Sequence, residues 1–202
     1  MNADSRSQSM GQAGTASEAR IVVARTNELT EAQRAAMHAL QVTCFSDVPY
    51  EELMEDFVAE SFAKVLAYLG EELVGCVSVF KREIEYEGRR MVLGGFGGTC
   101  TRADLRRRGI GTRVCRAATN LLREERCDVA FLAAAPGTER FYAQFGFGPL
   151  GKPYTFVNAR GVTKQPDTWD DGMLAPVCSR TLFHHILGGQ TPLHLGPEKG
   201  YW

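Results

Sequence analysis

The feature that constrains this chain most is an apolar, glycine-rich segment that leads through an arginine-rich turn into a long amphipathic helix. Met91–Thr101 has the composition of a buried strand, and apolar residues recur at helical spacing from Ile110 to Leu122, with arginines between them. The turn contains Gly109 and Gly111. A helix start has backbone N–H groups without intrahelical partners, its dipole favours negative charge, and glycine lets a phosphate approach closely. The segment therefore predicts an anion-binding site.

The spacing of this turn separates it from two common phosphate-binding loops. It lacks the Gly-Lys-Ser/Thr of a Walker loop, and Val114 stands where a dinucleotide fingerprint needs its third glycine. Its pattern, Arg-x-x-Gly-x-Gly from Arg106 to Gly111, resembles the loop that binds the acyl-CoA pyrophosphate in the GNAT superfamily of N-acyltransferases. Thr138–Phe147 carries Phe-Tyr-x-x-x-Gly-Phe, which resembles the second signature of that family. Without the resemblance, the turn is as typical of a solvated basic helix start.

The resemblance implies a mixed α/β fold, in which helices flank both faces of a central, splayed β-sheet. We expect a single acetyltransferase domain over residues 18–202, preceded by a disordered tail at residues 1–17, which are low in large apolar residues. Periodicity predicts an acidic helix that starts at Pro49. It also predicts a helix at 31–45 and strands at 20–25, 62–69, 73–86, 90–101, 129–133, 154–157 and 173–177, the last two being the final strands of the sheet.

Residues Gly94–Gly98 lie where the resemblance places the splayed strands. Glycine lets a ligand or another backbone approach a strand closely, so the run fits a strand distorted around a pantetheine arm. A β-bulge without a ligand explains the run equally well.

The resemblance implies acetyl-CoA as co-substrate and assigns residues to it. Backbone N–H groups at the strand end would meet the pantetheine and the carbonyl, and those of the turn, with arginine side chains, would meet the pyrophosphate. The cofactor-binding residues expected on this basis are Thr99, Cys100, Thr101, Arg106, Arg107, Arg108, Gly109, Ile110, Gly111, Thr112 and Arg113.

Tyr142 is the position that matches the family's proton donor to the departing thiolate. A tyrosine that merely packs against the sheet is the alternative. Relatives place a glutamate as general base on the strand before the loop, where this chain has Gly97 and Gly98. Four substitutes stay open, namely Glu83, Glu85, the Asp170–Asp171 pair and the C-terminal carboxylate of Trp202.

The acceptor is suggested by a likeness to the aminoglycoside 2′-N-acetyltransferases, carried by the ending Gly200–Trp202 and by Asp170–Gly172. In those enzymes acidic groups hold a polycationic sugar. The matching residues here are Asp47, Glu52, Asp170, Asp171 and Trp202. An acidic run from Asp47 to Glu60 without lysine or arginine agrees with a cationic acceptor, although a solvated helix face is an equal explanation.

Composition excludes other classes of function. The net charge is −1, which favours neither nucleic acid nor a membrane surface, and no apolar run is long enough to span a bilayer. Six cysteines without a Cys-x-x-Cys pair and no secretory signal predict a reducing cytoplasm, and the histidines lack metal-ligand spacing. We expect a small-molecule amine partner, with homodimerisation left open.

Two alternatives to an aminoglycoside enzyme follow from the same residues. One is a GNAT enzyme that acts on another small amine, an amino acid or a peptide. The other is a non-catalytic module that binds or senses acyl-CoA, against which the presence of Tyr142 argues.

Overall fold

The computed structural model describes residues 18–46, 49, 55–166 and 171–202, and its main body is a seven-stranded mixed sheet in the order β1-β2-β3-β4-β5-β9-β6. The strands of this sheet are β1 (Arg20–Arg25), β2 (Ala63–Leu69), β3 (Glu72–Tyr86), β4 (Arg89–Thr101), β5 (Val129–Ala133), β6 (Gly148–Pro149) and β9 (Gly172–Pro176). A three-stranded sheet contains β10 (Leu193–Lys199), β7 (Tyr154–Val157) and β8 (Thr163–Lys164). The helices are α1 (Glu31–Cys44), α3 (Ile110–Glu124), α4 (Glu139–Ala143) and α5 (Arg180–Gly188).

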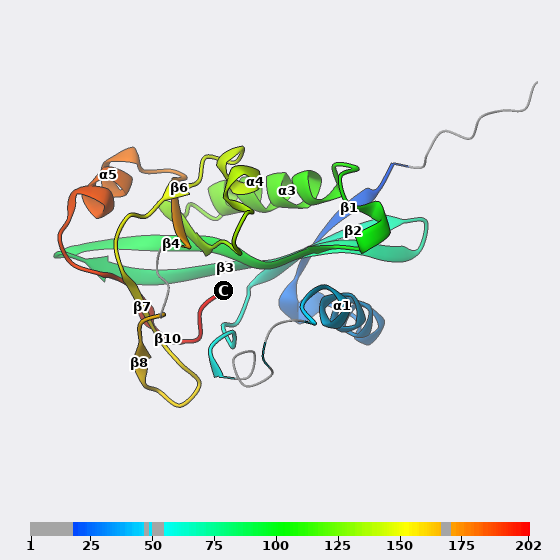
Figure 1. The fold of residues 1–202 in the computed structure, drawn as a ribbon, viewed down its shortest axis with the longest axis horizontal. Helices are drawn as coiled ribbons and strands as arrows, with labels where there is room; N and C mark the ends of the chain where they lie inside the picture. Colours follow the sequence, from blue (N-terminus) through cyan, green and yellow to red (C-terminus); the bar gives the residue numbers. More distant parts are fainter. Residues whose placement is uncertain (1–17, 47–48, 50–54, 167–170) are drawn as a thin grey trace, which may run out of the picture.

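Helices cover both faces of the main sheet, so the predicted mixed α/β fold is confirmed. Figure 1 shows α3 and α4 on one face, and α1 with the three-stranded sheet on the other. The helix α3 buries Ile110, Val114, Ala118 and Leu122, the apolar side predicted by the periodicity. The helix α1 begins at a capping box, in which the Thr30 side chain accepts from Gln33 N and the Gln33 side chain accepts from Thr30 N.

Most predicted strands form where the alternation of apolar residues placed them. Of the acidic helix predicted from Pro49, residues 50–54 lie outside the described residues, and from 55 to 60 only Glu55 is helical. One prediction about the sheet is wrong, because Tyr154–Val157 pairs in parallel with β10 in the second sheet and is not a strand of the main sheet. No element was predicted after residue 177, where the structure has α5 and, in the glycine- and proline-rich tail that begins at Gly188, β10. Its packing explains this, since Leu193 and Leu195 on β10 are fully buried.

The two central parallel strands separate along their length, as the resemblance implied. Among the described residues, β4 pairs with β5 only from Leu93 to Gly95, although β4 continues to Thr101. Beyond this point β4 also contains a β-bulge. Ser78 pairs with Gly97 and Cys76 with Cys100, so β4 has one residue more than β3 in this interval.

Trp202 occupies the space that the glycines of β4 leave on the α1 side of the sheet. A Cβ on Gly95 would lie 2.0 Å from Trp202 Nε1, and one on Gly97 would lie 2.8 Å from the main-chain carbon of Trp202. The indole stacks on Phe80 at 5.0 Å between ring centroids and donates to Phe131 O at 2.9 Å. On this face Gly95 and Gly97 therefore accommodate a residue of the chain itself. That the run also makes room for a pantetheine arm stays a prediction.

Candidate functional site

The turn before α3 has the geometry of an anion site. Gly109 caps the helix in the left-handed conformation at φ 79°, and Arg107 also has a positive φ of 64°. Within the described part of the chain, the backbone N–H groups of Gly109–Thr112 donate to no other residue, whereas Arg113 N donates to Gly109 O. Unpaired amides at a helix start attract a phosphate, and no atom lies within 4 Å of the position of a Cβ on Gly109. The residues therefore fit the pyrophosphate of CoA.

The arginines of this turn differ in how far they are already engaged. The Arg113 guanidinium lies 2.7 Å from a carboxylate oxygen of Glu18, and Arg106 Nε donates to Thr101 O at 3.4 Å. Arg107 and Arg108 are exposed and form no hydrogen bond or ion pair with the described residues. These two side chains are the ones most available to an incoming diphosphate.

Replacing Gly109 with alanine should weaken CoA binding by roughly tenfold or more, a loss of about 1.4 kcal/mol, because the methyl group fills space against the unpaired amides. The matched control is Gly88→Ala in the β3–β4 turn, where φ is 77° and a Cβ also meets nothing within 4 Å. Both variants carry the same left-handed strain, about 1–2 kcal/mol, so calorimetry with CoA separates strain from ligand contact. Equal CoA affinity in the two variants would remove the pyrophosphate from this turn.

Tyr142 lies on α4, on the α3 side of the sheet. Its ring packs at 6.1 Å from Phe96, between ring centroids, and at 6.5 Å from Phe147. Burial raises the pKa of the Tyr142 hydroxyl above its usual value, and the Thr99 hydroxyl acts in the opposite direction. The tyrosine is therefore protonated at neutral pH, the state that a proton donor needs.

The bulge in β4 shifts the alternation of side chains, so Thr99 points to the face opposite to that of Gly97. Thr99 turns towards Tyr142, and among the described residues its Oγ1 is a buried oxygen without a hydrogen-bond partner of normal geometry. Cys100 turns towards α1, where its Sγ lies 3.4 Å from that of Cys76. Thr101 O already accepts from Arg106. Thr99 thus offers an unpaired hydroxyl close to the predicted proton donor.

Of the acidic residues predicted to bind the acceptor, Asp47, Glu52 and Asp170 lie outside the described residues. Asp171 is described, and its carboxylate accepts from the Tyr154 hydroxyl at 3.1 Å. The Trp202 indole is buried. A role for Trp202 in binding an acceptor stays a prediction.

The register of the sheet places Glu83 and Glu85 too far from the bulge in β4 to act there as the general base. They pair with Val92 and Arg90 of β4, whereas the bulge lies beyond Gly97, the partner of Ser78. Glu83 is five residues from Ser78 along β3, about 16 Å in an extended strand. Both carboxylates therefore lie at the far end of the β3–β4 hairpin.

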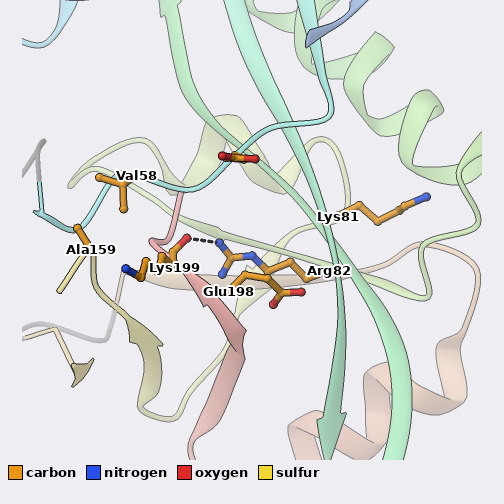
Figure 2. A pocket seen from close by; sticks show the side chains of 7 residues that line it. Val58, Lys81, Arg82, Ala159, Glu198 and Lys199 are labelled. Carbon is orange, nitrogen blue, oxygen red and sulfur yellow. Dashed lines mark hydrogen bonds between the residues drawn. The ribbon is translucent and has the colours of Figure 1, made fainter. Parts of the chain in front are cut away.

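A pocket of about 370 Å³ on the Trp202 side of the sheet was not predicted. Figure 2 shows Arg82 within it, beside Glu198 and Lys199. The pocket is lined by Val58, Glu60, Lys81, Arg82, Ala159, Glu198 and Lys199.

Arg82 is the unusual member of this pocket because it is buried. Its guanidinium donates to Leu195 O at 3.2 Å and to Lys199 O at 2.8 Å, and lies 4.8 Å from the Trp202 ring centroid. Burial lowers the pKa of Arg82, and Glu198 opposes this effect without forming an ion pair with it. A sequence signal existed, since Arg82 falls on the buried side of the alternation in β3, between Phe80 and Ile84.

The described residues give no indication of a metal site or of a membrane span. No three histidine, cysteine or carboxylate side chains among them are placed to hold a metal ion. No helix in the described ranges is long and apolar enough to cross a bilayer.

None of the curated proteins compared is significantly similar in sequence. Among solved structures, Escherichia coli ElaA superposes with a TM-score of 0.58 at 20% identity, covering 78% of this chain and 99% of its own. E. coli YhbS, a GNAT family N-acetyltransferase solved in complex with CoA, gives 0.58 at 16% identity and covers 89% of both chains. An acyl-CoA N-acyltransferase from Pseudomonas aeruginosa gives 0.56 at 17% identity, covering 78% of this chain and 99% of its own.

These structures share the fold with this chain, and a sequence profile supplies the family. The profile of the acetyltransferase (GNAT) domain matches residues 25–150, more than half of the chain, and includes the turn before α3 and the Tyr142 helix. The chain therefore belongs to the GNAT acetyltransferase family.

Proposed function

We propose that the protein transfers an acetyl group from acetyl-CoA to a primary amine. The observation that carries this proposal is the placement of unpaired amides at the start of α3 and of the protonated Tyr142 beside the separated strands β4 and β5. The turn would hold the diphosphate, and the separated strands would admit the acyl chain. In the reaction the amine nitrogen forms a bond to the carbonyl carbon while the carbon–sulfur bond breaks. Tyr142 gives its proton to the departing thiolate.

For the acceptor we propose a polycationic amine of the aminoglycoside type. Asp171 belongs to the acidic turn at Asp170–Gly172. Its main-chain oxygen accepts from Ala134 N, which places Asp171 directly beyond β5. Two acidic residues of the early run are already paired within the chain, Glu55 with Arg160 and Asp56 with Lys164. The support for this acceptor therefore comes from Asp171 and from the acidic residues outside the described ranges.

The Arg82 pocket favours a second candidate, an amine that also carries a carboxylate, such as an amino acid or a short peptide. A buried guanidinium without a carboxylate partner among the described residues can form a charge-assisted hydrogen bond to an anion. Glu60 and Glu198, which line the same pocket, would suit the ammonium group of such a molecule.

A panel of amines tests these proposals by release of the CoA thiol. We expect transfer to kanamycin- or gentamicin-type amines to exceed transfer to amino acids and peptides, with an acceptor KM that rises with ionic strength, because exposed ion pairs are screened over about 10 Å at 0.1 M salt. Preferential turnover of carboxylate-bearing amines would replace the aminoglycoside proposal with the second candidate. CoA binding without turnover of any amine would favour the sensing module.

A further inference from the structure

A lysine, a serine and a glycine lie side by side on three adjacent strands of the main sheet, on its α1 side. Lys64 of β2 pairs with Ser78 of β3, and Ser78 pairs with Gly97 of β4. The Lys64 Nζ and Ser78 Oγ atoms are 2.6 Å apart. Because directly paired residues point to the same face, the two side chains form a polar line that leads to the glycines of β4.

Lys64 is poorly placed to act as a simple surface charge. It is half-buried, Ser78 is buried, and no carboxylate of the described residues lies within 4 Å of its amine. The described titratable groups that face it are Cys76 on β3 and Arg34 on α1. Burial lowers the pKa of Lys64 most strongly, Cys76 opposes this, and Arg34 lowers it further. A neutral lysine amine has a lone pair that can accept a proton.

The row of Lys64, Ser78 and Gly97 ends beside the bulge in β4. A Cβ on Gly98 would lie 3.2 Å from Gln41 Nε2 and 3.9 Å from Ser78 Oγ, and Gly98 itself is exposed. The next residue, Thr99, turns to the opposite face, towards Tyr142. A proton acceptor on the Ser78 side and a proton donor on the Tyr142 side would thus lie on opposite sides of one strand.

We propose that Ser78 and Lys64 form the proton relay that deprotonates the acceptor amine beside the Gly97–Gly98 bulge. This inference rests on the proposed acetyl transfer. The Ser78 hydroxyl oxygen accepts a proton from the substrate ammonium as its own proton passes to the neutral Lys64 amine. The substrate nitrogen then has a free electron pair for the carbonyl carbon, and Lys64 becomes an ammonium ion. Ser78 would touch the substrate, and Lys64 would act through it.

The pH dependence of kcat/KM distinguishes a relay from a structural role. In the wild-type protein the acidic limb should follow the protonation of Lys64. Lys64→Arg keeps a cation in place but cannot lose its proton, so kcat/KM should fall about 100-fold or more, the scale of general base catalysis. Lys64→Met should abolish the same limb while leaving the unfolding temperature equal or higher, since it removes a desolvated charge. Ser78→Ala should reproduce the kinetic loss.

The matched control is Lys164→Met, which removes a lysine from β8 of the three-stranded sheet that pairs with Asp56 at 3.1 Å. It should leave the acidic limb unchanged. The relay is wrong if the Lys64 variants keep the wild-type limb while Tyr142→Phe is impaired.

NMR of lysine-labelled protein provides a readout that does not need an acceptor, and it is practical because the chain has five lysines. The Lys64 signal should titrate below about 10.4, the ordinary value for lysine. A Lys64 signal that titrates at or above this value would overturn the relay. Absence of turnover with every amine, by contrast, would contradict the proposed acetyl transfer, and the lysine titration would still be measurable.

Discussion

The Tyr142→Phe variant should lose between about tenfold and ten-thousand-fold in kcat, with little change in the KM for acetyl-CoA. Phenylalanine keeps the ring that packs on Phe96 and Phe147, so the fold and the cofactor site are retained. Only the proton for the departing thiolate is removed. Tyr68→Phe is a suitable control, because Tyr68 lies on β2 against Arg20, away from α4. A Tyr142→Phe enzyme with wild-type kcat, measured where chemistry limits the rate, would show that Tyr142 only packs.

The pH dependence of kcat tests whether the pKa of Tyr142 is raised, as its burial requires. Burial raises the pKa of its hydroxyl above the usual value of about 10. The active form of a proton donor is the protonated one, so its contribution is complete below the raised pKa and is lost as the pH rises through it. We therefore expect the alkaline limb due to Tyr142 to lie above pH 10 and to be absent from Tyr142→Phe. A limb well below pH 10 that disappears in this variant would contradict the effect of burial.

The parts of the site that depend on local patterns could be predicted from the sequence. The turn before α3 follows from glycines and arginines within six residues, and the strand and helix around it follow from apolar periodicity. The capping of α1 by Thr30 is also local. Such features need no knowledge of which strands pair.

The remaining features depend on long-range pairing, which periodicity does not encode. The pairing of Lys64 with Ser78 and of Ser78 with Gly97 requires the register of three strands, and the direction of Thr99 requires the bulge. The parallel pairing of β7 with β10 joins residues about 40 positions apart, across a segment rich in glycine and proline. No strand was predicted after residue 177, whereas tertiary packing of Leu193 and Leu195 stabilises one.

The interpretation of the glycine run shows the same limit. Glycine in a strand indicates that something approaches the backbone closely, but it does not identify what approaches. Here the approaching group is Trp202, more than 100 positions from Gly95 along the chain. The indole covers Gly95 and bonds to Phe131 O of the neighbouring strand, so the end of β10 and its extension are fixed to the centre of the main sheet.

Gly95→Ala should therefore destabilise the protein by about 3 kcal/mol or more, the upper part of the range for overpacking a core. The new Cβ would lie 2.0 Å from Trp202 Nε1 and 2.3 Å from Phe131 O. The second contact is with a backbone atom, which cannot move as a flexible side chain would. Displacing the indole to relieve the first contact would break its hydrogen bond and its stacking on Phe80, and would uncover the apolar cluster that it closes.

Gly148→Ala in β6 is the matched control, because a Cβ there meets no atom within 4 Å and φ is not in the left-handed region. Denaturant unfolding gives the free energy of unfolding of both variants. Each adds a methyl group to a strand, but only the one at Gly95 meets neighbouring atoms. Gly148→Ala should change the free energy of unfolding by less than about 1 kcal/mol. Equal stability of the two variants would mean that Trp202 does not pack against Gly95. Destabilisation confined to Gly95→Ala would show that Gly95 is required by the close approach of Trp202 and of Phe131 O.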